Sequence, residues 1–183
     1  AVQGLLDRRA AAVRSGDAAA FAATIDPSAP DAFRQRQLQW FAGLRSLPLG
    51  PFSLPVRTTD SGDLAAGLGL VAQHHADAAA LPETRMVYRL ADYDDRDASD
   101  AFWITYVRRA GSWYAAADDD ARSLGLDGTP ELWDDGALSV QRTAHFLVLS
   151  KLAQASRAAS LAGLAERAMD QFRRRWSVPW SER

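Results

Sequence analysis

The most informative stretch of this chain is residues 102–114, F-W-I-T-Y-V-R-R-A-G-S-W-Y. Aromatic and β-branched residues dominate it, and these residue types favour strands. The dipeptide Ala110-Gly111 divides two such runs, which predicts a β-hairpin with strands at residues 101–109 and 112–118. So many aromatic side chains in one hairpin also indicate a strongly curved central sheet.

Helical periodicity precedes this hairpin in the first 50 residues. Leu5 and Val13 recur at the spacing of one helical face, so the first helix is expected to bury that face. The charged residues of this helix are expected off that face: Asp7, Arg8, Arg9 and Arg14. Gly16 suits a helix end and Asp17 an N-cap, which predicts a second, short helix, and a third helix is expected over residues 31–47.

A strand period follows after residue 50. Alternating and β-rich residues predict strands at residues 52–59, 66–77 and 83–93, ahead of the hairpin. Helices followed by a run of strands are typical of an α+β fold. The sequence therefore predicts three N-terminal helices packed on a curved antiparallel sheet, followed by a strand–helix C-terminal extension.

The residue composition and its periodicity change after the hairpin. Residues 119–136 hold several turn-forming residues and little periodicity, which indicates a boundary. Residues 137–150 are predicted to form one long strand or two short ones, and residues 154–175 an amphipathic helix. The predicted organisation is an α+β domain at residues 1–122, a linker at residues 123–136 and a strand–helix extension at residues 137–183.

The composition removes several classes of function. The chain has 183 residues, no Cys and three His, which excludes disulfides, thiolate zinc clusters and a Cys nucleophile. It contains no H-E-x-x-H, P-loop or G-x-G-x-x-G motif, so no cofactor is expected. Acidic residues concentrate at residues 60–136, whereas basic residues outnumber acidic ones on both sides of this stretch, a distribution that argues against a nucleic-acid surface across the fold.

Two motifs carry a resemblance to a known family. They are L-L-D-R-R-A-A-A-V-R-S-G-D-A-A-A-F at residues 5–21 and the hairpin motif at residues 102–114. With this order of helices and strands, residues 1–122 resemble the nuclear-transport-factor-two-like fold, a cone-shaped α+β family that includes ketosteroid isomerase and polyketide cyclases. The resemblance implies no single function, because this fold hosts isomerases, cyclases, dehydratases and non-catalytic binding modules.

A second set of motifs is similar to the N-terminal part of some bacterial extracytoplasmic proteins. The motifs are A-A-A-D-D-D at residues 115–120, L-W-D at 132–134, and H-F-L-V-L-S at 145–150 before a helix that ends in W-x-x-x-W at Trp176 and Trp180. In those proteins a module of this fold precedes a gluzincin-like zinc-peptidase domain. The resemblance implies that residues 137–183 begin such a second domain.

Localisation is inferred from this resemblance and from the first residue. The chain begins with Ala1 rather than Met, and no apolar run approaches the roughly 20 residues that span a bilayer. We expect a processed, extracytoplasmic or membrane-anchored bacterial protein. Any membrane attachment is expected to use a segment that is absent from this sequence.

Strand alternation predicts the candidate site. The inward-facing residues are expected to be Leu68, Leu70, Ala72 and His74 on one strand, Met86, Tyr88 and Leu90 on the next, and Phe102, Ile104 and Tyr106 on the third. This set offers His74, Tyr88 and Tyr106 as polar groups for a ligand pocket, and no carboxylate. A His–Tyr pair could move a proton, although Tyr and His buried among so many aromatic residues more often have structural roles.

The remaining polar clusters favour no metal site. His74 and His75 would point to opposite faces of a strand, and His75 with Asp77 lacks a third ligand. The acidic runs lack the Gly and the terminal Glu of an EF-hand loop and are interpreted as solvated loop carboxylates: Asp92, Asp94, Asp95, Asp97 and Asp118 to Asp120. The arginines at residues 173–175 are interpreted as the polar face of the last helix.

Three functions remain open. The main hypothesis is a non-catalytic accessory or ligand-binding module of a larger extracytoplasmic protein, with an apolar small molecule and a downstream peptidase-like domain as partners. The first alternative is a small pocket enzyme of the isomerase or cyclase type, in which His74 and Tyr88 or Tyr106 transfer a proton. The second alternative is a dimerisation scaffold, a homodimer that pairs through the exposed face of its sheet.

Overall fold

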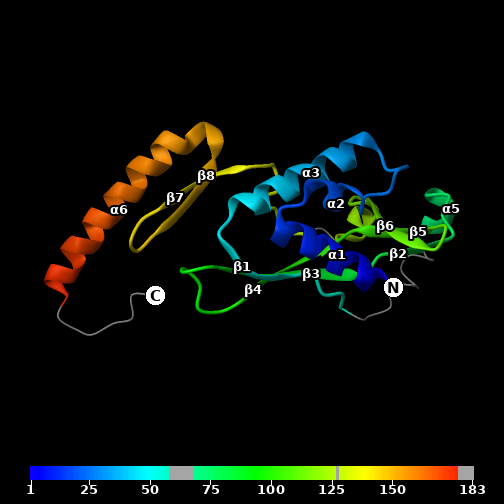
Figure 1. Ribbon diagram of the computed structural model, residues 1–183, viewed down its shortest axis with the longest axis horizontal. Coiled ribbons are helices and arrows are strands. Elements are labelled where there is room, and N and C mark those ends of the chain that lie inside the picture. Colours follow the sequence, from blue (N-terminus) through cyan, green and yellow to red (C-terminus); the bar gives the residue numbers. More distant parts are fainter. Residues whose placement is uncertain (58–67, 127, 177–183) are drawn as a thin grey trace.

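The order of the elements follows the sequence prediction. The computed structural model describes residues 1–57, 68–126 and 128–176. In these residues three helices cover one side of a bent antiparallel sheet, and a hairpin followed by a long helix extends from one end (Figure 1). The fold class is therefore α+β, as predicted.

The N-terminal helices begin and end where the local sequence predicts. The helices are α1 (Val2–Ser15), α2 (Ala18–Ala22) and α3 (Asp31–Ser46). Gly16 ends α1 with a left-handed φ of 75°, and its N–H bonds back to the last turn of the helix. The side chain of Asp17 then accepts the N–H of Ala20 at 2.8 Å, which caps α2.

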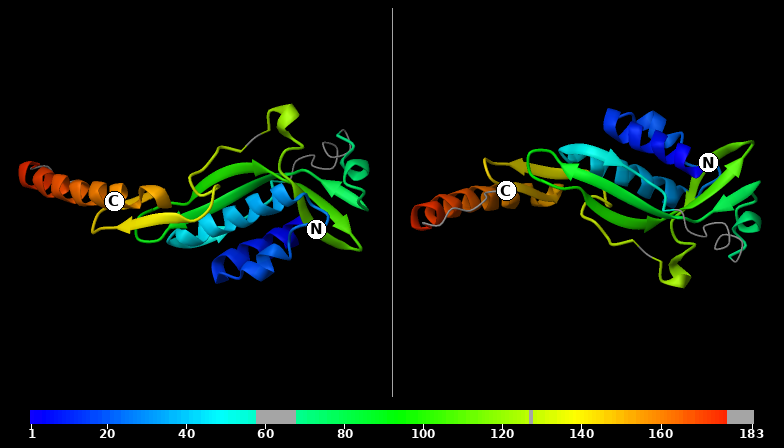
Figure 2. Two further views of the ribbon diagram at one scale, coloured as in Figure 1. Left: turned by 90° about the horizontal axis from the view of Figure 1, so that it is seen from above. Right: turned by 90° about the horizontal axis from the view of Figure 1, so that it is seen from below.

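Two small antiparallel sheets meet at a bend under these helices (Figure 2). Their strands are β1 (Leu49–Ser53), β2 (Ala78–Ala80), β3 (Glu83–Leu90), β4 (Ala98–Trp103), β5 (Thr105–Arg109) and β6 (Ser112–Ala117). Among the described residues, one sheet has the order β1-β3-β4 and the other has the order β2-β5-β6. Because β4 leads directly into β5, the chain passes from one sheet to the other across Ile104.

The expected strand at residues 101–109 is thus two strands rather than one. Its first part belongs to β4, which pairs with β3, whereas β5 pairs with β2 and β6. Ile104 lies at the bend with 6% of its surface exposed, so the change of partner takes place inside the core. The predicted hairpin is confirmed, because Ala110 and Gly111 both have positive φ (47° and 80°), as two-residue hairpin turns require.

The expected strand at residues 66–77 is wrong over most of its length. Its first two residues lie outside the described part, and a helical turn, α5 (Leu70–Gln73), precedes the short strand β2. Leu70 is buried at 1% exposure, so the segment places this side chain in the core and then turns away. His75 adopts a left-handed φ of 48°, which is outside the range of a strand. The alternation expected for residues 68–74 is consequently absent.

The other two expected strands are present. Residues 83–93 were expected to form a strand, and β3 covers most of them. The strand expected at residues 52–59 is found a few residues earlier as β1, and residues 58–59 lie outside the described part. Pro55 follows β1, which is an edge strand of its sheet, where a missing N–H donor is tolerated.

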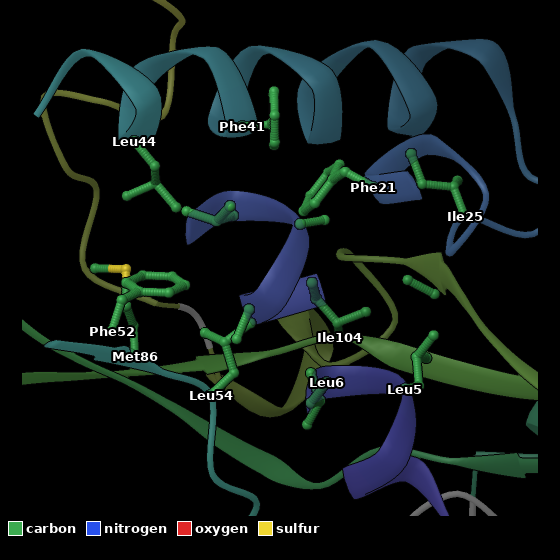
Figure 3. Packing of buried hydrophobic residues seen from close by; sticks show 14 of the residues in the cluster. Leu5, Leu6, Phe21, Ile25, Phe41, Leu44, Phe52, Leu54, Met86 and Ile104 are labelled. Carbon is green, nitrogen blue, oxygen red and sulfur yellow. The ribbon is translucent and has the colours of Figure 1, made fainter. Parts of the chain in front are cut away.

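The core lies between the helices and the bent sheet (Figure 3). Leu6 of α1 and Phe21 of α2 are both fully buried. The ring of Phe21 lies 4.9 Å from that of Phe41 on α3, and Met86 of β3 closes the core from the sheet side at 3% exposure. This packing holds α3 in a fixed position over the sheet.

Residues beyond the sheet form a separate layer. It contains β7 (Leu138–Arg142), β8 (Leu147–Lys151) and α6 (Ala155–Arg175), with a short 3-10 turn at Leu152–Gln154 before α6. A second 3-10 turn, at Arg122–Leu124, follows β6. Residues 137–150 thus form two short strands, one of the two predicted arrangements. Helix α6 packs on this hairpin and extends away from α1–α3 (Figures 1 and 2). The first Trp of the W-x-x-x-W motif follows α6, and Trp180 lies outside the described residues.

No helix in the described part of the chain combines the length and the apolar character needed to cross a bilayer. The exposed side chains of α6 include large apolar ones: Leu161, Leu164 and Phe172.

The contact between α6 and the β7–β8 turn is expected to weaken in acid. Glu166 of α6 accepts the backbone N–H of His145 at 2.8 Å and contacts His145 Nδ1 at 2.8 Å. Hydrogen bonds from Thr143 and His145 lower the pKa of Glu166 to about 2. Because folding lowers the pKa of this carboxyl group, the contact is stabilised at pH values above the ordinary pKa of about 4.3. This stabilisation is lost as the pH falls toward 2.

Hydrogen exchange of residues 138–175 between pH 5 and roughly pH 2 measures this weakening. Glu166→Gln is the matched variant, because it keeps the shape of the side chain and removes its titration. We expect the variant to exchange faster at pH 5 and to show a smaller further change on acidification. Equal acid responses of the two proteins would contradict the assignment.

Candidate functional site

A pocket of about 460 Å³ opens between α3, β4 and the segment that follows β6. We call it the α3/β4 pocket. Helix α3 contributes Arg36, Gln37 and Trp40, β4 contributes residues 100–103, and the opposite wall is made by residues 128–131 and 133–135. These parts lie far apart in the sequence, so the pocket exists only when the tertiary fold has formed.

Two contacts hold the wall at residues 128–135 against the rest of the molecule. Lys151 of β8 donates from Nζ to the carbonyl oxygen of Leu132 at 2.7 Å and to Asp135 at 2.9 Å. On the other side, Gly43 of α3 touches the backbone of Trp133 so closely that a Cβ added at Gly43 would lie 2.0 Å from the Trp133 carbonyl oxygen. The wall is therefore fixed to both the helical layer and the C-terminal hairpin.

Aromatic and apolar side chains cover the interior of the pocket. The rings of Trp40 and Phe102 lie 6.2 Å apart and tilted. Met86 and Ile104 complete this surface. Strand alternation predicts that Met86, Phe102 and Ile104 face inward, and their burial agrees with this, since Met86 and Ile104 are in the core and Phe102 packs against it. The pocket is nevertheless lined by consecutive residues of β4, including Ala101 and Trp103.

Trp133 lines the pocket and also carries an unpaired indole N–H. The residue is 6% exposed, and its Nε1 is buried without a hydrogen-bond partner in the described part of the chain. Its ring meets that of Tyr88 edge to face at 5.6 Å. A buried N–H without an acceptor is rare in native proteins and destabilising.

A buried arginine orients Gln37 behind the pocket. Arg9 of α1 is 1% exposed and donates to the side-chain oxygens of Thr24, at 2.9 Å, and Gln37. Its guanidinium also lies 4.3 Å from the ring centre of Phe21. Because the oxygen of Gln37 is held by Arg9, its amide nitrogen remains as the donor on the pocket side.

The burial of Arg9 corrects a sequence expectation. Arg9 was expected off the buried face of α1, yet it is among the largest fully buried side chains. Burial lowers the pKa of Arg9 to about 10, and the neighbouring Tyr106 partly offsets that effect. In the described residues no carboxylate pairs with Arg9, so neutral oxygens and aromatic rings solvate the charge.

Five carboxyl groups belong to the lining, and three of them carry no ion pair in the described part of the chain: Asp100, Glu131 and Asp134. Burial, followed by the charges of Asp100 and Asp134, raises the pKa of Glu131. Burial likewise raises the pKa of Asp134, whose Oδ2 accepts the backbone N–H of Glu131 at 2.8 Å. The effect of Asp100 and Asp134 on the pKa of Glu131 indicates that both carboxyl groups lie near Glu131.

His74, the first of the predicted site residues, belongs to a different polar cluster. It ends α5, and its Nε2 lies 2.8 Å from Oδ2 of Asp120. Gln73 and Thr105 also donate to Asp120. Burial by itself would raise the pKa of Asp120, but the bonds from His74, Thr105 and Gln73 outweigh it and lower that pKa. This cluster joins α5, β5 and the end of β6, which is a structural connection.

The two predicted tyrosines, Tyr88 and Tyr106, have contacts different from those of His74. Tyr106 is fully buried and its hydroxyl lies 3.2 Å from Oγ1 of Thr84. Burial raises the pKa of Tyr106, and the positive charge of Arg9 partly opposes this. Burial, followed by the charges of Asp100 and Glu131, raises the pKa of Tyr88 to about 12. Neither tyrosine, nor His74, is among the residues that line the α3/β4 pocket.

The chain matches no family model, no curated protein and no solved structure.

Geometry alone therefore guides the assignment of the site, and it offers no metal centre. Among the described residues, no group of three or more His, Asp or Glu side chains is placed to hold a metal ion. His75 is exposed, and the backbone at this position is not a strand. Asp77 accepts the N–H of Ala110 at 2.9 Å and so supports the β5–β6 turn.

Sequence reasoning missed most polar residues of the pocket. Asp100 lies two residues before Phe102, so extending the alternation of the inward face by one step would have found the carboxylate that the predicted set lacked. Gln37 and Arg9 lie on different helices and meet only in the fold. Trp133 lies in a segment without periodicity, and no local pattern places its ring against β3 and β4.

Proposed function

We propose that this chain is a non-catalytic ligand-binding module that holds a small, largely apolar molecule in the α3/β4 pocket. The lining of the pocket carries the proposal, because it combines the rings of Trp40 and Phe102 with a few polar groups, as small-molecule sites do. The pocket volume of about 460 Å³ falls within the range of about 300–1,000 Å³ that is usual for small-molecule sites.

The positions of the candidate proton-transfer residues favour binding over catalysis. A general acid or base must reach the ligand, and His74, Tyr88 and Tyr106 are not lining residues of this pocket. The ring of His74 bonds to Asp120, and the pKa values of both tyrosines are raised. A tyrosine with a raised pKa is a weaker acid near neutral pH, so the isomerase or cyclase alternative receives no support from these contacts.

We test the binding site with naphthylmethanol, a neutral aromatic probe. Isothermal titration calorimetry is expected to show saturable binding of one probe per chain. Phe102→Ala removes a lining ring and is expected to raise Kd about fivefold or more, because one aromatic contact contributes on the order of 1 kcal/mol. Tyr114→Ala on β6 is the control, since it removes a half-buried ring outside the pocket.

An unchanged Kd in Phe102→Ala would show that the probe binds elsewhere and would contradict the proposal. An equal loss of affinity in Phe102→Ala and Tyr114→Ala would contradict it for the same reason. Absence of saturable binding to the wild-type chain would contradict it as well.

We also propose that the module has the nuclear-transport-factor-two-like fold and acts as an accessory part of a larger extracytoplasmic protein. Three helices on a bent sheet and the motifs at residues 5–21 and 102–114 support this proposal. The intact mass of the native protein, with zinc analysis of the same sample, tests it. A longer zinc-bearing species is expected, whereas a metal-free product of 19.9 kDa would contradict the proposal.

A further inference from the structure

The lining of the α3/β4 pocket has an uneven distribution of charge. Among the described residues it contains five acidic side chains and two arginines. Arg36 is bound to Asp118 through Nε and Nη2, and Asp135 is bound to Lys151. These pairs neutralise charges at the ends of the segment that forms the wall. They leave the middle of the pocket with a surplus of negative charge.

Asp134 carries part of this surplus, and the rest comes from Asp100 and Glu131. Both are half-buried, and neither forms an ion pair with a basic side chain of the described residues. Asp100 comes from β4 and Glu131 from the opposite wall, so the two carboxylates reach the pocket from different parts of the chain. Half-buried carboxylates without a cation are less favourable than paired ones, and a cationic group bound between them would gain from both.

The surroundings fit an organic cation better than a metal ion. The carboxylates are not placed to hold a metal ion with a third ligand among the described residues. Trp40, Phe102 and Trp133 line the same pocket, and aromatic rings attract a protonated amine through their π faces.

We propose that the α3/β4 pocket selects a ligand in which an apolar body carries a protonated amine, with the amine between Asp100 and Glu131. This inference rests on the proposed binding function and deepens it by naming the charge of the ligand. A neutral apolar ligand would fill the same volume but leave both carboxylates unpaired. An anionic ligand would be repelled by them.

Three probes of equal shape and different charge test the inference on the full chain. They are naphthylmethylamine, which is cationic near neutral pH, naphthylmethanol, which is neutral, and naphthoate, which is anionic. We expect Kd to be about fivefold lower for the amine than for the alcohol and highest for naphthoate. The preference for the amine is expected to shrink as the salt concentration rises.

Two isosteric variants locate the cation. Glu131→Gln and Asp100→Asn are each expected to weaken binding of the amine about threefold to fivefold and to change binding of the alcohol less than about twofold. Asp95→Asn removes the same charge from an exposed residue outside the pocket lining and serves as the control. It is expected to leave both affinities within about twofold of the wild type.

The outcomes separate the two proposals. If the alcohol binds in the pocket and the amine binds no better, or if naphthoate binds best, the cation selectivity is overturned and the binding function stands. If the amine preference persists in both pocket variants, Asp100 and Glu131 are not its cause and the inference is overturned. If none of the probes binds, the proposed function itself fails.

Discussion

Replacing Arg109 with methionine is expected to lower the free energy of unfolding by about 3–5 kcal/mol, because it leaves the buried carboxylate of Asp26 without its cation. The side chain of Asp26 is 1% exposed, and Arg109 donates to it from Nε and from Nη2, the latter at 2.8 Å. Arg109 also donates to the carbonyl oxygens of His74 and His75, both at 2.7 Å. One guanidinium therefore joins the loop after α2, the end of α5 and β5.

Urea unfolding measures this loss, and a double-mutant cycle assigns it to the ion pair. The double variant, Asp26→Asn with Arg109→Met, removes both charges. Its loss of unfolding free energy is expected to be smaller than the sum of the losses in the two single variants. Arg108→Met on the same strand is the control, because Arg108 is exposed. Equal losses in Arg108→Met and Arg109→Met would show that the buried contact contributes nothing specific.

Replacing Gly43 with alanine is expected to lower the free energy of unfolding by roughly 1–3 kcal/mol through overpacking. The added Cβ would lie 2.0 Å from the carbonyl oxygen of Trp133 and 2.9 Å from that of Gly136. Both obstacles are backbone atoms, so a change of side-chain rotamer cannot relieve the clash. The wall at residues 133–136 must move away from α3, and the α3/β4 pocket is expected to lose its shape.

Two measurements check this second result. Urea unfolding reports the stability, and calorimetry with naphthylmethanol reports the pocket, where we expect Kd to rise. Gly4→Ala in α1 is the matched control, since a Cβ at Gly4 meets nothing within 4 Å. There alanine is expected to stabilise the helix by up to about 1 kcal/mol. A stabilised Gly43→Ala variant with unchanged Kd would show that α3 and the wall are not in close contact.

The parts of the fold that depend on neighbouring residues could be predicted from the sequence. Gly16 and Asp17 carry the backbone conformation and the side-chain acceptor that end one helix and begin the next. Ala110 and Gly111 set the turn of the hairpin, and the resulting strands follow from their residue types. In each case the interactions that form the element lie within a few residues.

The parts that failed depend on distant contacts. Residues 70–73 have the composition of a strand, but the burial of Leu70 fixes a helical turn instead. The run at residues 101–109 is divided because its two halves pair with different strands. Arg9 is buried because Thr24, Gln37 and Phe21 surround it. Its spacing of four residues from Leu5 and Val13 was compatible with the buried face, but its charge suggested the opposite.

The candidate site was predicted only in its apolar part. Alternation on β3 and β4 identifies Met86 and Phe102, since a strand fixes the direction of its side chains. The wall at residues 128–135 has no period, and its position is set by contacts with Gly43 and Lys151. No sequence pattern could therefore predict the polar residues of that wall.

The attachment of α6 has a consequence for the rate of folding. This helix packs on β7 and β8, which directly precede it in the chain, so its contacts close short loops. The bridge between Ile25 and Ala115, by contrast, joins residues from the two ends of the N-terminal α+β part. Structures dominated by local contacts form faster than those that need distant pairings. Residues 138–175 are therefore expected to assemble early, before the slower N-terminal part. They then dock on it through the bond from Leu138 to Ser46 of α3, while Lys151 binds Leu132.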